Sequence, residues 1–189
     1  MAKRIFDVIG SIILLLILFP LYLFIFIVLR LTQKGSVLFV QERIGKGGRP
    51  FDIYKFRSMK LDSEVDGQPR LAQKHDERLT KAGRFLRKHH LDELPQLWNV
   101  LKGDMSFVGP RPERQYYIDK IMEHNPRYVE IYKIRPGLTS YATLYNGYTD
   151  TMDKMLKRLD MDLEYLESQS LLTDMRIILQ TAKRMIIGE

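Results

Sequence analysis

Hydrophobic residues are spread very unevenly along this chain. Residues 8–29 contain no charged side chain, whereas Asp, Glu, Lys and Arg are frequent in the remainder. Within this stretch, residues 12–29 read IILLLILFPLYLFIFIVL, which is about the minimum length for a helix that crosses a bilayer. The pattern therefore predicts a membrane-embedded segment, residues 1–34, attached to a polar domain, residues 35–189.

Pro20 stands near the middle of the apolar run. A straight helix over residues 8–29 would be about 33 Å long, enough for a hydrocarbon core of about 30 Å. A proline inside the helix removes one backbone hydrogen bond and bends it, so each arm reaches only about half that depth. The pattern favours a re-entrant hairpin that enters one leaflet and returns. A kinked single pass remains the alternative.

Basic residues stand at both ends of the run, Lys3 and Arg4 before it and Arg30 and Lys34 after it. A spanning helix normally has its basic excess on one side. Flanks of the same sign therefore favour the same membrane face, where these cations would meet lipid phosphates. A cleavable signal peptide is disfavoured, because no small-residue cleavage site follows the run.

The polar domain begins with signals for a β-hairpin and two helices. Residues 35–41 and 51–56 are β-type runs on either side of the glycine-rich sequence ERIGKGGRP. Thr80 precedes one helical pattern, and Pro95 begins a second that ends at Gly103. The other expectations are a surface loop at 61–77, a non-helical corner at 108–112, a helix at 113–124, an irregular stretch at 135–150 and two final helices. The predicted fold class is α/β, mostly helical with a small β-hairpin.

The last helical segment, LLTDMRIILQTAKRMII, has an apolar stripe at helical spacing. The stripe consists of Leu171, Met175, Ile178, Leu179, Ala182 and Ile186. Such a stripe fits a helix that packs on the core. It equally fits a basic amphipathic helix on a lipid surface, because Lys183 and Arg184 lie off the stripe. Both interpretations stay open.

Charge and cysteine content narrow the class of partner. Lys and Arg number 30 against 23 Asp and Glu, which gives a formal net charge of +7. This excess predicts an anionic partner, and nucleic acid, lipid headgroups and phosphorylated small molecules all fit it. The chain has no cysteine, which excludes a disulfide scaffold, a Cys-ligated metal and a cysteine nucleophile.

The sequence HHLDELPQLWNVLKGDMSFVGPRPE carries the most chemistry. Asp92 and Glu93 are adjacent carboxylates just ahead of the helix that Pro95 begins. Asp92 could simply cap that helix. The same position also places a carboxylate where helix N–H groups, Arg87 and Lys88 would gather phosphate. A carboxylate there could attack phosphorus or hold a divalent metal.

Two further segments combine arginine with proline and glycine. They are GPRPE, with Arg111, and RPGLT, with Arg135 and Thr139. Flanking prolines fix the backbone and leave a guanidinium free to bind phosphate, although rigid surface turns would look the same. Lys55 and Arg57 in YKFRSM complete this set of cations.

The segment LDELPQLWNVLKGDMSFVGPRPE resembles the signature of the bacterial sugar transferases, the small monotopic phosphoglycosyl transferases. The resemblance extends through KRIFD, VLFVQERIGKGGRPFDIYKFRSM, DERLTKAGRFLRK, RPGLTSYA and LDMDLEYLESQSLLTDMRIILQTA. It implies a re-entrant membrane helix and interfacial amphipathic helices. It also implies a catalytic domain on the cytoplasmic face of the bacterial inner membrane.

The resemblance further implies a reaction. A sugar 1-phosphate would move from a UDP-sugar to a polyprenol phosphate, usually undecaprenyl phosphate, with Mg²⁺ and release of UMP, as the first membrane step of glycoconjugate or polysaccharide assembly. Asp92 would form an aspartyl phosphosugar, and Glu93 would assist through metal or proton handling. Arg111 would bind phosphate, with Arg135 and Thr139 as contributors. Lys55, Arg57 and Arg87 are the other expected substrate-binding residues.

The chain departs from the family pattern at two places. Phe19 stands where many members have Ser before the membrane proline, and Ser140 and Tyr148 replace a Gly and an Arg. Contacts to the sugar or nucleotide around the second place cannot be carried over. The identity of the UDP-sugar, the pathway and the oligomeric state, a homodimer included, stay open.

Two other classes of function compete. A membrane-tethered adaptor could use the basic charge, but no nucleic-acid motif is present and the cations lie beside Pro and Gly, so no nucleic-acid partner is expected. A glycosyltransferase with a metal-binding Asp-x-Asp is disfavoured, because Asp160 and Asp162 fall in a predicted helix.

Overall fold

The computed structural model describes the chain except residues 62, 64–68, 72–75, 148 and 188–189. Much of the surface loop expected at 61–77 and the substituted position Tyr148 lie outside the described residues. The described part of the chain is mostly helical with two small sheets, as expected for the α/β class.

The apolar run breaks where Pro20 predicts a break. Helix α1 (Ala2–Ile17) and helix α2 (Phe19–Thr32) meet at Leu18 with a bend of 60°. Pro20 lies in the first turn of α2, where its missing N–H has no intrahelical partner to lose. Among the described residues, only this bent pair taken together, and no single helix, has the length and apolar character of a membrane span.

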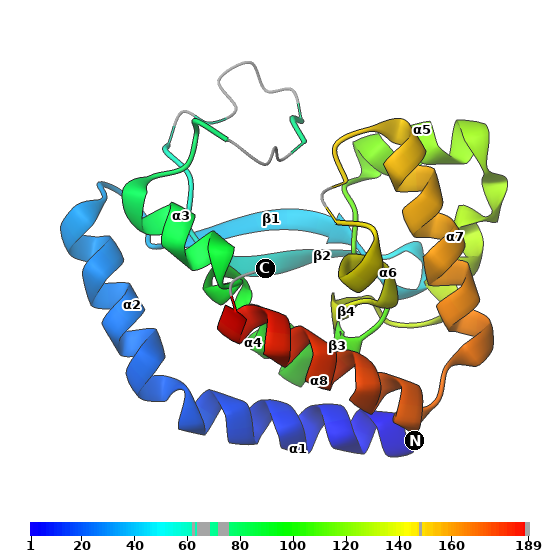
Figure 1. Cartoon of the computed structure of the whole chain (residues 1–189), viewed down its shortest axis with the longest axis horizontal. Coiled ribbons are helices and arrows are strands. Elements are labelled where there is room, and N and C mark those ends of the chain that lie inside the picture. Colours follow the sequence, from blue (N-terminus) through cyan, green and yellow to red (C-terminus); the bar gives the residue numbers. More distant parts are fainter. Residues whose placement is uncertain (62, 64–68, 72–75, 148, 188–189) are drawn as a thin grey trace.

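The inner side of the helix pair packs on the polar domain. Figure 1 shows α1 along the lower edge and α2 rising from its end. Asp7 is buried in α1, where one carboxylate oxygen accepts hydrogen bonds from Ser106 Oγ at 3.0 Å and from the backbone N–H of Phe107 at 3.1 Å. The buried residues of α2 are Ile25 and Leu29. A polar anchor thus fixes α1, whereas α2 is held mainly by apolar packing.

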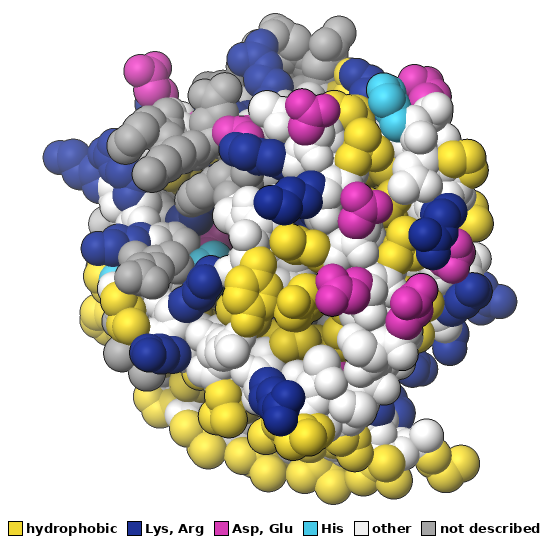
Figure 2. Space-filling view, turned by 45° about the vertical axis from the view of Figure 1, so that its right-hand side comes forward, with side chains coloured by type: hydrophobic (Ala, Val, Ile, Leu, Met, Phe, Trp, Pro, Cys, Tyr) yellow, Lys and Arg dark blue, Asp and Glu magenta, His cyan; other side chains and the backbone are white. Residues whose placement is uncertain are grey.

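The outer side of the helix pair is apolar and exposed. The exposed side chains are Ile5, Ile9, Ile12, Ile13, Leu14, Leu16, Ile17, Phe19, Leu23, Phe24, Phe26, Ile27 and Leu31. Figure 2 shows hydrophobic side chains continuing along the lower edge, the edge along which α1 runs in Figure 1. A surface of this size is unusual for a protein surrounded only by water.

The basic residues before the run have internal partners. Arg4 donates to the carbonyls of Val100 at 2.6 Å and Leu101 at 2.8 Å, near the end of helix α4 (Gln96–Lys102). Lys3 forms an ion pair with the buried Asp174. The expectation that these two cations meet lipid phosphates stays a prediction. Both fix α1 to the domain, because free carbonyls at a helix end and a buried carboxylate both need a donor.

The predicted β-hairpin is present. Strand β1 (Leu38–Ile44) pairs antiparallel with β2 (Pro50–Phe56), in a register that places Leu38 opposite Phe56. The turn contains the short 3-10 helix η1 (Lys46–Gly48). Gly47 and Gly48 have φ of 71° and 70°. Residues with a Cβ rarely adopt such positive φ values, so glycine suits both positions.

The two helices signalled by Thr80 and Pro95 also form. In α3 (Lys81–Lys88), the Thr80 hydroxyl accepts the N–H of Gly83 at 2.9 Å. After the 3-10 turn η2 (Leu91–Glu93), α4 begins directly after Pro95. It ends with the capping residue Gly103, whose φ is 97°. These boundaries agree with the cap signals because caps depend on local sequence.

A second sheet was not expected from the sequence. Strands β3 (Ser106–Val108) and β4 (Gly137–Thr139) pair in parallel, where a corner and an irregular stretch were predicted. The pairing brings the two arginine-proline segments side by side: Gly137 N–H donates to Pro110 at 2.9 Å and Gly109 N–H donates to Thr139 at 3.1 Å. A three-residue strand is too short to show a β pattern of its own.

The remaining helices complete the domain. They are α5 (Gln115–His124), the 3-10 helix η3 (Pro126–Lys133), α6 (Tyr141–Tyr145), α7 (Met152–Ser168) and α8 (Leu171–Ile187). Only part of the apolar stripe on α8 packs on the core. Ile178 packs against a buried cluster, whereas Leu171, Met175 and Leu179 are exposed. The side of α8 that packs inward carries the buried Asp174 and Ile177.

Candidate active site

The Asp92-Glu93 pair lies on a strained turn. His90, just before η2, has φ 52° and ψ 20°, the left-handed conformation that non-glycine residues seldom adopt. Strain of this kind is common at functional sites. No side chain caps η2 or α4. The capping role considered for Asp92 is therefore wrong, and its carboxylate is not used to stabilise the helix.

Glu93 joins two distant parts of the chain. Its Oε1 atom accepts hydrogen bonds from Lys55 Nζ at 2.6 Å and from Arg111 Nη2 at 2.8 Å. Lys55 comes from β2 and Arg111 from the segment after β3. Burial alone would raise the pKa of Glu93, but Arg111 and Lys55 outweigh it and hold the pKa well below its usual range. Glu93 is therefore a charged carboxylate that fixes two cations.

The two cations respond differently to this pairing. The charge of Glu93 raises the pKa of Arg111 although burial opposes it. Burial lowers the pKa of Lys55 more than Glu93 raises it. Lys55 is thus the member of this cluster whose positive charge is least favoured by its surroundings.

Asp92 is next to the cluster of Glu93, Lys55 and Arg111 but forms none of its ion pairs. The residue is 6% exposed, and no described residue donates a hydrogen bond to its carboxylate. Neither carboxylate oxygen is a fully buried atom without a partner, so the small exposed part of Asp92 includes its carboxylate. Burial, and then the charge of Glu93, raise its pKa, while Lys55, Arg87 and His90 lower it. The carboxylate is thus available to a reactant.

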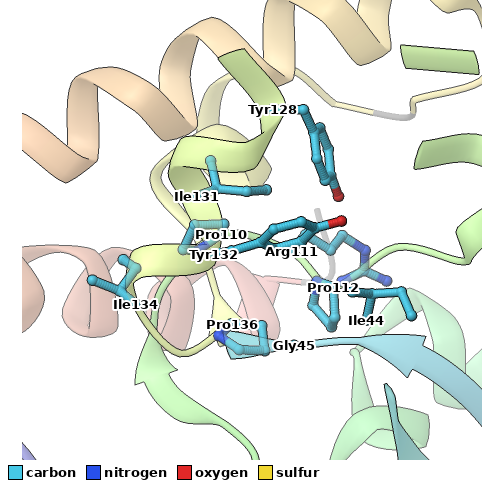
Figure 3. Close-up of a pocket in the computed structure, with 10 residues that line it drawn as sticks. All are labelled: Ile44, Gly45, Pro110, Arg111, Pro112, Tyr128, Ile131, Tyr132, Ile134 and Pro136. Atoms are coloured by element: carbon cyan, nitrogen blue, oxygen red, sulfur yellow. The ribbon is translucent and has the colours of Figure 1, made fainter. Parts of the chain in front are cut away.

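Arg111 emerges from a rigid segment. Figure 3 shows it between Pro110 and Pro112, with the rings of Tyr128 and Tyr132 beside it. These residues, with Ile44 and Pro136, line a narrow crevice. Because proline fixes φ near −65°, the backbone on both sides of Arg111 has little freedom.

The other predicted substrate-binding residues have different surroundings. Arg57 is buried and donates to Gln33 Oε1 at 3.2 Å, at the end of α2. Arg135 donates to the carbonyl of Gly103 at 2.7 Å, at the far end of α4 from Asp92. Thr139 shares a 2.7 Å hydrogen bond with Thr181 of α8. The structure thus brings together Asp92, Glu93, Lys55 and Arg111, with Arg87 acting on Asp92 through its charge, and it turns Arg57, Arg135 and Thr139 to other partners.

A second buried charge cluster lies behind Arg111 and was missed by sequence reasoning. Glu113 pairs with Arg158 at 2.9 Å and with Arg43 at 3.3 Å. Burial would raise the pKa of Glu113, but Arg158 and Arg43 lower it below its usual value. Asp162 lies one turn after Arg158 in α7 and is 2% exposed. The one sequence feature that could have indicated this cluster is Glu113, the last residue of the GPRPE segment.

The carboxylates suit a hard cation. Among the described residues, no group of three or more His, Asp or Glu is arranged to hold a metal ion. Mg²⁺ does not require one, since it commonly binds one or two carboxylates, several waters and the phosphates of a substrate. Asp92 fits such a cation best, because Glu93 is already neutralised by Lys55 and Arg111.

Comparisons with known proteins identify the family of this chain. The sequence profile of the family described as "Bacterial sugar transferase" matches residues 1–188. The chain therefore belongs to that family.

Curated relatives are sugar-phosphate transferases. One is the UDP-N-acetylgalactosamine-undecaprenyl-phosphate N-acetylgalactosaminephosphotransferase of Aeromonas hydrophila, 39% identical over 98% of this chain and 44% of its own length. Another is the UDP-glucose:undecaprenyl-phosphate glucose-1-phosphate transferase of Klebsiella pneumoniae, 40% identical over 99% of this chain and 40% of its own length. This chain spans about two fifths of these two relatives. It also matches the exopolysaccharide production protein PSS of Rhizobium leguminosarum, 40% identical over 95% of this chain and 92% of that protein.

Proposed function

We propose that this chain transfers a sugar 1-phosphate from a UDP-sugar to undecaprenyl phosphate through an aspartyl phosphosugar on Asp92. The observation that carries the proposal is the open carboxylate of Asp92 beside Glu93, whose own charge is held by Lys55 and Arg111. The names of the relatives support the two substrates. Their differing sugars leave the UDP-sugar undetermined.

In the first step, a carboxylate oxygen of Asp92 forms a bond to the β-phosphorus of the UDP-sugar. The bond from that phosphorus to the bridging oxygen breaks, and UMP leaves with the electron pair. Arg111 and Lys55 would stabilise the charge that develops on the diphosphate oxygens, which is usually a large part of the acceleration of phosphoryl transfer. Glu93 keeps both cations in place before the substrate arrives.

In the second step, a phosphate oxygen of undecaprenyl phosphate attacks the same phosphorus and releases Asp92. The product is an undecaprenyl diphosphate sugar. Asp92 would hold magnesium, with Glu93 next to it already paired with Lys55 and Arg111. The magnesium would offset charge on the diphosphate.

The location of the site supports this pair of substrates. We propose that α1 and α2 enter the cytoplasmic leaflet of the inner membrane and return, so that residues 35–189 stay on the cytoplasmic side. Exposed apolar side chains cover the outer side of both helices, and the bend of 60° shortens their reach. The exposed stripe of α8 would lie on the same interface. A lipid phosphate and a soluble nucleotide sugar could then meet at Asp92.

The reaction can be tested with the purified chain in detergent. We expect continued UMP release from a UDP-sugar only when undecaprenyl phosphate is present in excess. Without it, release should stop at close to one UMP per protein. Asp92→Asn should abolish both, whereas Asp119→Asn on the exposed side of α5 should change neither. Turnover by Asp92→Asn, or the absence of any UMP from a panel of UDP-sugars, would contradict the proposal.

The membrane arrangement has its own test, because the chain lacks cysteine. Single cysteines can be placed at two exposed positions, Ala2 at the start of α1 and Ser36 after the end of α2. A membrane-impermeant maleimide should label both from the cytoplasmic side only. Labelling of the two positions from opposite sides would show a single pass.

A further inference from the structure

The charge cluster behind Arg111 is built from three separate elements. Glu113 follows the loop after β3, Arg158 lies in α7 and Arg43 in β1. Glu113 and Arg158 are each 6% exposed. Taking such charges out of water is expensive, and a buried ion pair commonly adds little to stability compared with apolar residues of the same size. The cluster therefore calls for another explanation, and fixed geometry is the best supported one.

The contacts of the cluster hold the backbone around Arg111. Arg43 donates to the carbonyl of Pro112 at 3.4 Å as well as to Glu113. The N–H of Ile44 donates to the carbonyl of Glu113 at 3.0 Å. From α7, Arg158 Nη2 pairs with Glu113 Oε1 at 2.9 Å. Side chains and backbone thus fasten this segment to β1 and α7.

The opposite end of the segment is fastened by the second sheet. Gly109 and Pro110 both make backbone hydrogen bonds to β4. Arg111 is therefore held between two fixed points, β4 on one side and Glu113 on the other. Between them Pro110 and Pro112, drawn beside Arg111 in Figure 3, remove most of the remaining backbone freedom because each proline fixes φ.

We propose that Glu113 is a positioning residue that acts through Arg111: paired with Arg158 and Arg43, it sets the loop so that the Arg111 guanidinium reaches Glu93 beside Asp92. The proposal rests on the proposed transferase function for its catalytic consequence. A planar guanidinium binds phosphate well only in the correct orientation. A displacement of about 1 Å can lower a rate by about 10²-fold.

The first measurement is kinetic. In Glu113→Gln, the KM for the UDP-sugar should rise about tenfold while kcat changes less, because a displaced Arg111 weakens binding of the diphosphate before and during the reaction. In an Arg111→Lys background the same change should add less than about twofold, since the residue through which Glu113 acts is already altered. Glu130→Gln, which removes a half-buried partner of the exposed Arg127, is the matched control and should leave KM unchanged.

The second measurement does not depend on turnover. The rotation rate of the Arg111 guanidinium reports its attachment to Glu93. Nitrogen-15 NMR of the Arg111 Nε–H measures this rate, and the signal is assigned by its loss in Arg111→Lys. Glu113→Gln should speed that rotation in protein that remains folded by circular dichroism. If Glu113→Gln does not fold, Arg43→Gln removes the bond to Pro112 and should show a smaller change in the same direction.

The outcomes separate the two proposals. A wild-type chain without transferase activity contradicts the proposed function, and the NMR experiment still decides the role of Glu113. Two results would overturn the positioning role. One is an unchanged Arg111 NMR signal in a folded Glu113→Gln variant. The other is an equal effect of Glu113→Gln on KM in the wild-type background and in the Arg111→Lys background.

Discussion

The hydroxyl of Tyr22 in α2 donates a hydrogen bond to the backbone carbonyl of Leu94, two residues after Asp92. The ring of Tyr22 lies 5.7 Å from that of Phe56, the neighbour of Lys55 in β2. Leu94 also shares a buried cluster with Ile25 of α2. The second apolar helix is therefore attached directly to the turn that carries Asp92.

This attachment predicts the effect of Tyr22→Phe. The substitution keeps the ring but removes the hydroxyl, which should lower the free energy of unfolding by about 1 kcal/mol and UMP release about fivefold. Chemical unfolding and steady-state turnover in nanodiscs measure the two effects. Tyr145→Phe removes a hydroxyl that bonds Gln180 on the surface and serves as the control. Equal behaviour of the two variants would show that the Tyr22 hydroxyl does not support the turn.

Glu93→Gln tests the balance of charge in the site. The variant leaves Lys55 and Arg111 close together without their shared anion, so we expect a loss of about 2 kcal/mol of stability and a loss of activity on the order of 10²-fold. Adding Lys55→Met should restore much of the stability, because one buried cation is removed, but not the activity. Recovery of turnover in the double variant would show that Lys55 takes no part in the reaction.

Asp162 predicts a pH dependence of stability. Burial raises its pKa to about 7 from an ordinary value of 3.8, although Arg158 lowers it. The folded chain therefore keeps a proton that the unfolded chain releases. The contribution of this group to the free energy of unfolding should fall as pH rises from about 4 to about 7 and then level off. Asp162→Asn lacks this contribution, so the difference between variant and wild type in chemical unfolding should change across that interval. A constant difference would contradict the prediction.

Removal of divalent cations should stop the reaction without unfolding the chain. Glu93 is already balanced by Lys55 and Arg111, so a metal is expected to act on the diphosphate rather than on the fold. We expect EDTA to abolish UMP release, Mg²⁺ to restore it, and the melting temperature to stay constant throughout. Full activity in EDTA would exclude a required metal, and a large fall in melting temperature would indicate a structural one.

Gly137→Ala tests the parallel strand pair. A Cβ at this position would lie 2.1 Å from the backbone nitrogen of Gly109, so the strands would have to separate. The expected loss is about 3 kcal/mol, with lower activity because Arg111 lies only two residues after Gly109. Gly47→Ala has a positive φ of 71° but no neighbour within 4 Å, and should lose only about 1 kcal/mol. Similar losses in both variants would show that the close approach is unimportant.

Predictions that depended on local sequence agree with the structure. The bend at Pro20, the Thr80 cap, the end of α4 at Gly103 and the β-hairpin are all found. Each follows from backbone geometry or hydrogen bonding within a few residues. The paired segments β3 and β4 were missed because each consists of only three residues and depends on the other.

Partners distant in sequence account for the remaining differences. Arg57 and Arg111 look alike as cations beside apolar elements, yet one turns to Gln33 and the other to Glu93. Lys3 and Arg4 look like membrane flanks but bind a buried carboxylate and the end of α4. The choice of partner is made by packing, which no periodicity or motif records.

The sequence by itself therefore determined the division into an apolar bent segment and a polar domain, the family resemblance and the carboxylate pair. Hydrophobic patterning, proline geometry and a long contiguous motif are properties of the chain before it folds. Only the tertiary structure decided which cations meet Glu93, that Asp92 stays open beside them, and that Glu113 fastens the segment of Arg111. These outcomes depend on contacts between residues far apart along the chain, whose distances exist only after the elements have packed.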